Sequence, residues 1–242
     1  MPPWRGADIL GPMKRSEINT ILAEAADFIG GFGVRLPPFA RWSPAGMQAR
    51  RAEIGGIVER RLGWDVTDYG AGRFAEMGLV LFTLRNGRLA DLRRGRGMCY
   101  AEKLLISRAG QLSPMHRHRL KAEDIINRGG ATLAVELFGS DAAGNFDLGA
   151  GGTVQCDGIA RAFAPGEVLH LAPGESVTLM PGDWHAFWGE GGDVLIGEVS
   201  TVNDDVTDNV FRDPVARFAA VAEDTAPDHL LVSDYDAWLG TP

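Results

Sequence analysis

The chain is poor in cysteine and contains no long apolar run. Its only two cysteines, Cys99 and Cys156, exclude a disulfide framework and favour a reducing compartment. No apolar stretch approaches the ~18–20 residues of a membrane helix, and the N-terminus lacks the charged and apolar regions of a signal peptide. We therefore expect a cytoplasmic protein with no membrane-spanning segment.

Basic residues are also scarce relative to acidic ones. The 242 residues include 24 lysines and arginines against 32 aspartates and glutamates, which gives a net charge of −8. A negative protein repels nucleic-acid phosphates and anionic lipid headgroups. The balance excludes nucleic acid and membrane surfaces as expected partners. The sequence shows no repeat or internal linker, so we expect one domain, and residues 1–12 carry no pattern that we can interpret.

Helical periodicity is confined to the first third of the chain. Ser16 is predicted to cap a first helix with an apolar face over residues 18–29, and Gly30-Gly31 to end it. A second helix is predicted to start at Ser43-Pro44, a capping serine followed by proline at the first helical position, and to run to Gly63.

From Gly78 the texture changes to short apolar segments separated by turn residues, which is typical of a barrel or sandwich. Asn86-Gly87 and Asp157-Gly158 favour tight hairpin turns. We predict an all-β barrel over residues 78–242, including a C-terminal extension, with residues 1–77 as a helical segment packed on it. The predicted strands are residues 79–84, 100–107, 133–138, 153–155, 159–163, 168–171, 176–180, 186–188 and 194–202.

Three of the five histidines stand in two segments framed by glycines. His116 and His118 are two residues apart on a predicted strand, so their side chains point to the same face. Glu123 follows the next bend, and His185 lies in the later segment. Three imidazoles and one carboxylate suit a divalent ion and leave coordination positions open for chemistry. We predict a catalytic metal site at these four residues, in place of packing histidines on unrelated strands or a closed structural metal site.

These segments resemble the two motifs of the cupin superfamily. Two departures occur in the second motif: Pro181 stands one residue late, and Gly189 replaces an asparagine. The resemblance implies a cupin double-stranded β-helix, or jelly-roll, barrel with N-terminal helices. It does not select among isomerases, dioxygenases, decarboxylases and sugar-binding modules. The matching positions are Gly110, His116, His118, Glu123 and Gly130 in the first motif and Gly174, Gly182 and His185 in the second.

Longer segments are similar to the D-lyxose isomerases, a resemblance that runs from Met13 to the region of Val232. It implies interconversion of D-lyxose and D-xylulose, often also of D-mannose and D-fructose, with a divalent metal that is usually Mn. Zn, Co, Fe and Ni suit the same ligands. We also expect a sugar as the small-molecule partner and a homodimer. The segments begin at Met13, Leu36, Trp42, Leu62, Phe82, Tyr100, Glu123 and Val202.

The implied isomerisation requires removal of a proton from C2, delivery of one to C1, and stabilisation of the cis-enediolate between them. Lys121 lies between two predicted ligands and would stabilise that anion, unless it is a solvated loop residue. Lys103 and Glu198 are charges within apolar strands. Lys103 would face the cavity or be a structural charge, and Glu198 would be the proton-transfer base or only pair with a nearby cation. Glu136 and Glu223 are further candidates for the proton-transfer base, and the sequence does not separate them from Glu198.

Two other classes of function stay open at this stage. An Fe(II) dioxygenase uses a similar ligand set, and a non-catalytic sugar-binding cupin would bind pentoses without turnover. Three aspartates would hydrogen-bond sugar hydroxyls in the isomerase or the sugar-binding cupin, or would form a solvated acidic turn. They are Asp204, Asp205 and Asp208.

Overall fold

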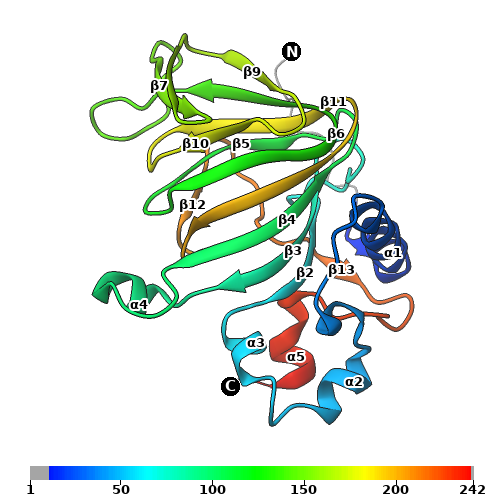
Figure 1. Cartoon of the computed structure of the whole chain (residues 1–242). Helices are drawn as coiled ribbons and strands as arrows, with labels where there is room; N and C mark the ends of the chain where they lie inside the picture. The colour runs from blue at the N-terminus through cyan, green and yellow to red at the C-terminus, as the bar shows by residue number, and fades with distance from the viewer. Residues whose placement is uncertain (1–10, 241–242) are drawn as a thin grey trace.

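The computed structural model describes residues 11–240 and shows a jelly-roll barrel with helices along one side (Figure 1). This confirms the predicted all-β cupin fold with few helices. Eleven strands form one connected sheet system. They are β2 (Gly63–Thr67), β3 (Leu79–Asn86), β4 (Tyr100–Ser107), β5 (Ser113–His118), β6 (Glu123–Phe138), β7 (Gly152–Cys156), β8 (Ile159–Phe163), β9 (Glu167–Leu171), β10 (Ser176–Leu179), β11 (Trp184–Thr201) and β12 (Asn209–Phe211).

The two longest strands, β6 and β11, run antiparallel and hold the barrel together. The first half of β6 also pairs with β10 and its second half with β9, while β11 also pairs with β4 and β5. β11 was predicted as two strands because the glycines at 189, 191 and 192 interrupt the apolar pattern. The structure absorbs this interruption in a register shift between Glu190 and Val194.

The barrel interior is apolar, as the alternation of the strand residues requires. On β6, Leu133, Val135 and Leu137 are fully buried in the main core cluster. This core surrounds the cavity that contains the histidines described below. Within residues 11–240, no helix is long and apolar enough to cross a membrane.

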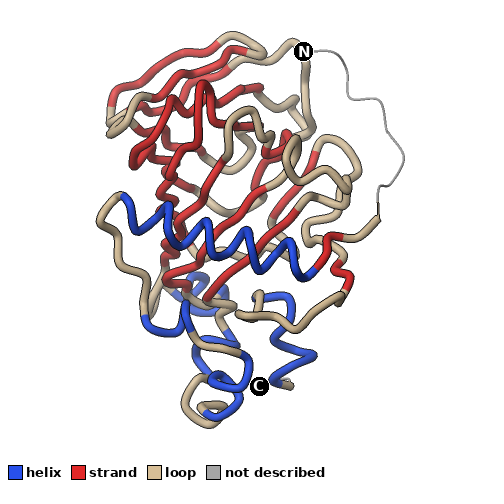
Figure 2. The backbone as a smooth tube through the Cα atoms, turned by 90° about the vertical axis from the view of Figure 1, so that its right-hand side faces the viewer, coloured by secondary structure: helices blue, strands red, loops and turns tan. Residues whose placement is uncertain are grey.

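The first predicted helix is present as α1 (Arg15–Gly31), which lies across the outside of the strands (Figure 2). Its buried residues Ile18, Leu22 and Ile29 pack in the same cluster as Val80 of β3. The predicted serine cap is wrong, because Ser16 lies inside the helix. The carboxylate of Asp224 accepts the Ser16 N–H at 2.9 Å, so a distant segment supplies the cap.

The second predicted helix is two short helices, α2 (Pro44–Ala49) and α3 (Gly55–Glu59). Ser43 does cap the first, accepting the Gly46 N–H at 3.1 Å. Gly55 and Gly56 make a continuous helix costly, and the chain turns between residues 50 and 54. This break places the apolar residues of both helices against α5 (Tyr235–Leu239) near the C-terminus.

One predicted turn is confirmed and one is wrong. Asp157 and Gly158 both have positive φ, 49° and 82°, and join β7 to β8 as a tight hairpin. Gly87, by contrast, follows β3 but leads into α4 (Leu89–Arg94) before the chain returns as β4. The Asn86 amide is engaged elsewhere, donating to the Asn203 carbonyl at 2.9 Å.

The structure adds strand β2 at the edge of the barrel, within the segment expected to be helical. Its sequence mixes glycine, tryptophan and aspartate, so it shows no alternation, and all five residues are buried. Near the other end of the chain, β13 (Val221–Ala222) pairs with β1 (Met13–Lys14). Two 3₁₀ helices, η1 (Pro38–Arg41) and η2 (Val232–Asp234), complete the elements.

Candidate active site

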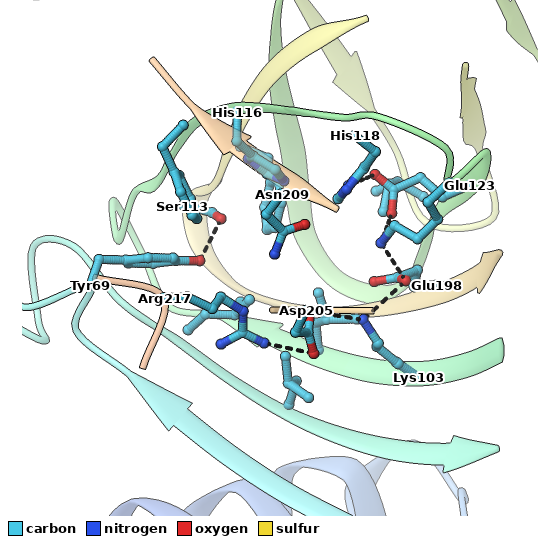
Figure 3. Close-up of a pocket in the computed structure, with 17 residues that line it drawn as sticks. Tyr69, Lys103, Ser113, His116, His118, Glu123, Glu198, Asp205, Asn209 and Arg217 are labelled. Carbon is cyan, nitrogen blue, oxygen red and sulfur yellow. Dashed lines mark hydrogen bonds and ion pairs between the residues drawn. The ribbon is translucent and has the colours of Figure 1, made fainter. Parts of the chain in front are cut away.

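His116, His118 and Glu123 line a cavity of the barrel (Figure 3), and the buried His185 completes a group of three imidazoles beside it. His185 on β11 lies directly opposite His116 on the antiparallel strand β5, and His118 is two residues further along β5. One ring nitrogen from each histidine lies within 4.8 Å of the others. Glu123 begins β6, and its Oε1 is 3.1 Å from His118 Nε2 and 3.2 Å from His185 Nε2. The structure thus brings together all four predicted ligands.

Backbone carbonyls fix the orientation of two of the rings. His116 Nδ1 is 2.8 Å from the Pro114 carbonyl, and His185 Nδ1 is 3.1 Å from the Asp183 carbonyl. Because a carbonyl oxygen only accepts, each Nδ1 must carry the proton, which leaves the lone pair on Nε2. His185 Nε2 is buried and makes no well-formed hydrogen bond, although Glu123 Oε1 lies 3.2 Å away. An inward-facing, unprotonated Nε2 held in this way is the usual form of a metal-ligating histidine.

The protonation states also fit a divalent cation. Burial, together with the neighbouring imidazoles, lowers the pKa of His116 well below 6.5. Burial and the cation of Lys121 lower the pKa of His118 as well. Burial opposes ionisation of Glu123, but Lys121 and His118 outweigh it and hold the pKa of this carboxyl well below 4.5. Neutral imidazoles and an ionised carboxylate are the forms that bind a metal ion.

Beside the histidines, buried lysines and glutamates form a chain of alternating charge. Lys121 Nζ lies 2.6 Å from Glu123 Oε2 and 2.9 Å from Glu198 Oε1. Glu198 on β11 pairs in register with Lys103 on β4, whose Nζ is 3.3 Å from the same Oε1. All four residues are at most 3% exposed. The three predicted catalytic residues therefore line one cavity, and both lysines contact Glu198.

The contacts among these lysines and glutamates determine their charge states. Burial disfavours the ammonium of Lys121, but Glu123 and Glu198 overcome it and raise the pKa of this lysine. Burial likewise disfavours the carboxylate of Glu198, but Lys103 and Lys121 overcome it and lower the pKa of this glutamate. At neutral pH Lys121 is a cation and Glu198 an anion. Between these two, only Glu198 has a basic form that can accept a proton.

Sequence reasoning missed a second group on the opposite side of the cavity, where Figure 3 shows Tyr69 and Arg217. Arg217 comes from the C-terminal segment and lies 3.0 Å from Asp205, one of the predicted sugar-binding aspartates. It also donates to Asp65 of β2 at 2.9 Å. The one signal in the sequence was the charge of Asp65 between the apolar residues Trp64 and Val66. It could not be interpreted because strand β2 was not predicted.

Two hydroxyls lie near this arginine. The Tyr69 hydroxyl is 2.9 Å from Ser113 Oγ at the start of β5. Burial raises the pKa of Tyr69 to about 12, so the phenol is neutral. Tyr69 also has φ of 56°, an uncommon conformation for a residue other than glycine. Neither residue stood in a recognisable motif.

Four other predicted candidates lie outside the cavity. Glu136 is on β6 between the core residues Val135 and Leu137, so alternation turns it to the outside. Glu223 pairs with Arg15 of α1 at 2.6 Å, and its side chain is 50% exposed. Asp204 accepts the N–H groups of its own loop. The carboxylate of Asp208 is likewise occupied by backbone N–H groups.

A buried three-histidine centre in a jelly-roll barrel, next to paired lysine and glutamate side chains, defines a cupin with a candidate metal-dependent active site. A model of the D-lyxose isomerase family matches residues 13–235. The chain is 48% identical over 226 residues to a D-lyxose/D-mannose isomerase of Serratia proteamaculans and 45% identical over 229 residues to one of Escherichia coli O157:H7. Both alignments cover 92% of this chain and 98% of the relative. The chain belongs to the D-lyxose isomerase family and is a sugar isomerase.

Solved structures support the fold independently. The L-ribose isomerase of Acinetobacter sp. DL28 in complex with L-ribose has a TM-score of 0.58 at 15% identity, covering 89% of this chain and 100% of that chain. The L-ribose isomerase of Cellulomonas parahominis with L-psicose has a TM-score of 0.55 at 19% identity, covering 90% and 100%. At these identities the likeness concerns the fold alone.

Proposed function

We propose that this protein interconverts D-lyxose and D-xylulose, and D-mannose and D-fructose, by proton transfer through a cis-enediolate. The observation that supports this most directly is the contact of Glu198, an ionised carboxylate, with the cation of Lys121 beside the histidine cluster. The curated relatives are named for D-lyxose and D-mannose. We further propose Mn²⁺ as the preferred ion, a homodimer, and a cytoplasmic location.

In this proposal, His116, His118, Glu123 and His185 hold one divalent ion. When bound, such an ion polarises the sugar carbonyl and stabilises charge on its oxygen. The pKa values of His116, His118 and Glu123 are all lowered, so at these three ligands little protonation change opposes binding.

The protein groups carry the proton and hold the charge. The Glu198 carboxylate accepts the proton from C2 of the aldose and returns one to C1, while the hydroxyl proton of O2 passes to O1, so that the carbonyl moves from C1 to C2. The Lys121 ammonium, fixed between Glu123 and Glu198, stabilises the enediolate. Lys103 keeps Glu198 ionised and holds it from the other side. The cavity wall that carries Arg217 and Asp205 supplies hydrogen bonds to the remaining sugar hydroxyls.

The two alternative functions are not favoured. A dioxygenase has no use for a buried Lys–Glu–Lys arrangement beside the ion, and a sugar-binding module has no need of an ionised carboxylate between two lysines. The family match points to the isomerase instead.

A substrate panel tests the proposal. Protein stripped of metal and reloaded with Mn²⁺ is incubated with D-lyxose, D-mannose or D-xylose, and the ketose is measured. We expect turnover of D-lyxose and D-mannose, slower turnover of D-xylose, and loss of all three activities with chelator. Oxygen consumption would support the dioxygenase instead, and pentose binding without turnover would support the sugar-binding module.

A further inference from the structure

Asp208 contacts two parts of the candidate active site without lining its cavity. It is 6% exposed and stands immediately before β12. That strand pairs with β5, with Asn209 opposite His118. The backbone therefore places the Asp208 side chain next to a predicted metal ligand and next to the loop that follows it.

The first contact is with the loop that carries Lys121. Asp208 Oδ1 accepts the N–H groups of Arg119 at 3.1 Å and Leu120 at 2.7 Å, and Oδ2 accepts that of Lys121 at 3.1 Å. One carboxylate thus binds three consecutive backbone donors. An ionised acceptor makes such bonds stronger than a neutral one, so the loop has one defined conformation.

The second contact is with the imidazole of His118. Its Nε2 faces Glu123 at 3.1 Å, on the side of the other two histidines. Its Nδ1, on the other side of the ring from that contact, is buried and has no hydrogen-bond partner. Asp208 Oδ2 lies 3.6 Å from this Nδ1, roughly half an ångström beyond ordinary hydrogen-bond range. His116 and His185 have carbonyl acceptors at the corresponding position, and only His118 has a carboxylate.

We propose that Asp208 is a positioning residue that sets a metal ligand and Lys121 together. Its Oδ2 accepts from His118 Nδ1–H, which selects Nε2 as the ligand atom, while both oxygens fix the loop that aims Lys121 at Glu198. This rests on the proposed metal centre. A carboxylate behind a ligating histidine raises the basicity of the imidazole and fixes its ring orientation, and loss of such a group typically lowers metal affinity ~10–100-fold.

The substitution Asp208→Asn separates the two contacts from general loop stability. Asparagine keeps one oxygen that can accept from Arg119 and Leu120, but places an NH₂ group opposite Lys121 N–H and His118 Nδ1–H. Asp141→Asn is the matched control, because Asp141 also accepts two N–H groups of its own loop, from Ala143 and Asn145, both at 2.8 Å. Asp141 is not among the cavity-lining residues.

The measurement is the affinity of the whole chain for Co²⁺, obtained by competition with a coloured chelator, together with the visible spectrum of the bound ion. We expect Asp208→Asn to bind Co²⁺ at least ~10-fold more weakly, with an altered spectrum, and Asp141→Asn to match the parent. A parent-like affinity for Asp208→Asn, or an equal loss in Asp141→Asn, would overturn the proposal. So would a fall in kcat at unchanged affinity and spectrum, since Asp208 would then act on the loop alone.

A second measurement does not depend on a variant that folds. Imidazole ¹⁵N chemical shifts of the Zn²⁺-loaded parent protein should show His118 bound through Nε2 and protonated at Nδ1. Ligation through Nδ1 would contradict the proposal. The Co²⁺ affinity, the Co²⁺ spectrum and the ¹⁵N shifts are all measured without a sugar. A protein without isomerase activity would therefore refute the proposed function and leave this inference standing or falling on those three readouts.

Discussion

At the scale of single residues, the account depends on opposite charges held by one another inside the barrel. Glu198 Oε1 is within 3.3 Å of both lysines, so neither lysine can be removed without changing the charge state or position of this carboxylate. Desolvation would shift the pKa of an isolated buried lysine or glutamate toward its neutral form. Here desolvation is outweighed, and the charged forms persist.

Replacing Lys121 by methionine tests its role as the electrostatic stabiliser. General acid–base and charge-stabilising groups contribute ~10²–10⁴-fold to rate, so we expect kcat for D-lyxose to fall at least ~100-fold with the metal still bound. Lys14→Met, at the exposed end of β1, is the control and should leave kcat unchanged. A Lys121→Met enzyme within about threefold of the parent would reduce Lys121 to a structural ion-pair partner.

Replacing Glu198 by glutamine tests the proton-transfer base. The amide keeps the shape but cannot accept the C2 proton, so kcat should fall by ~10²-fold or more at unchanged metal content. Glu136→Gln provides a comparison, since that side chain was a candidate base and lies outside the cavity. A larger fall in kcat for Glu136→Gln than for Glu198→Gln would contradict the assignment of Glu198 as the base.

At the scale of elements, sequence patterns correctly predicted those strands and turns whose conformation is determined by neighbouring residues. The two histidines of β5 were found because their spacing alone places them on one face. The second half of β6 and the hairpin at Asp157 were found for similar reasons. The Ser16 cap and the turn at Gly87 were wrong because distant residues, Asp224 and Asn203, bind these segments. The continuous second helix was wrong because Gly55 and Gly56 were not weighed against its apolar pattern.

The attachment of α1 to the C-terminal segment gives a prediction at this scale. Arg15 is fully buried and donates to both oxygens of Asp234 at 2.9 Å and to Glu223. Removing one partner of a buried ion pair leaves an uncompensated charge, so Arg15→Met should lower the free energy of unfolding by about 3 kcal/mol. Urea unfolding measures this. Arg73→Met removes only a surface pair with Glu76 and should cost less than about 1 kcal/mol. Equal effects of the two variants would contradict the argument.

At the scale of the whole molecule, the site contains some residues that stand in sequence motifs and others that only the fold brings together. The proximity of the four candidate ligands and Lys121 could be predicted because two motifs carry them. Tyr69, Ser113 and Arg217 could not, because they come from a loop after β2, the start of β5 and the C-terminal segment, which meet only in the folded barrel. No spacing in the sequence reports such contacts.

The same buried charges make the stability of the metal-free protein depend on pH. The pKa values of His116 and His118 are lowered, so the unfolded chain binds more protons below pH 6.5 and stability begins to fall there. The pKa values of Glu198 and Asp205 are also lowered, so their contribution is present above about pH 4.5 and is lost as the pH falls further. Asp65 and Asp183 have raised pKa values and act in the opposite sense, but the carboxyls whose pKa values are lowered, Glu123, Glu198 and Asp205 among them, outnumber them. Urea midpoints should be level from pH 7 to 8, decline below 6.5 and drop steeply below 4.5; level midpoints down to pH 4 would contradict these charge states.

The central claim is that metal-dependent proton transfer converts an aldose to a ketose in this cavity. The most direct test is to follow D-lyxose by NMR in D₂O with metal-stripped protein, before and after addition of Mn²⁺. The account predicts no reaction before addition and formation of D-xylulose afterwards, with deuterium at C1, because a proton held on Glu198 exchanges with solvent before it is returned. Ketose formed with no deuterium at C1 at any stage of partial conversion, or formed equally well without metal, would contradict it.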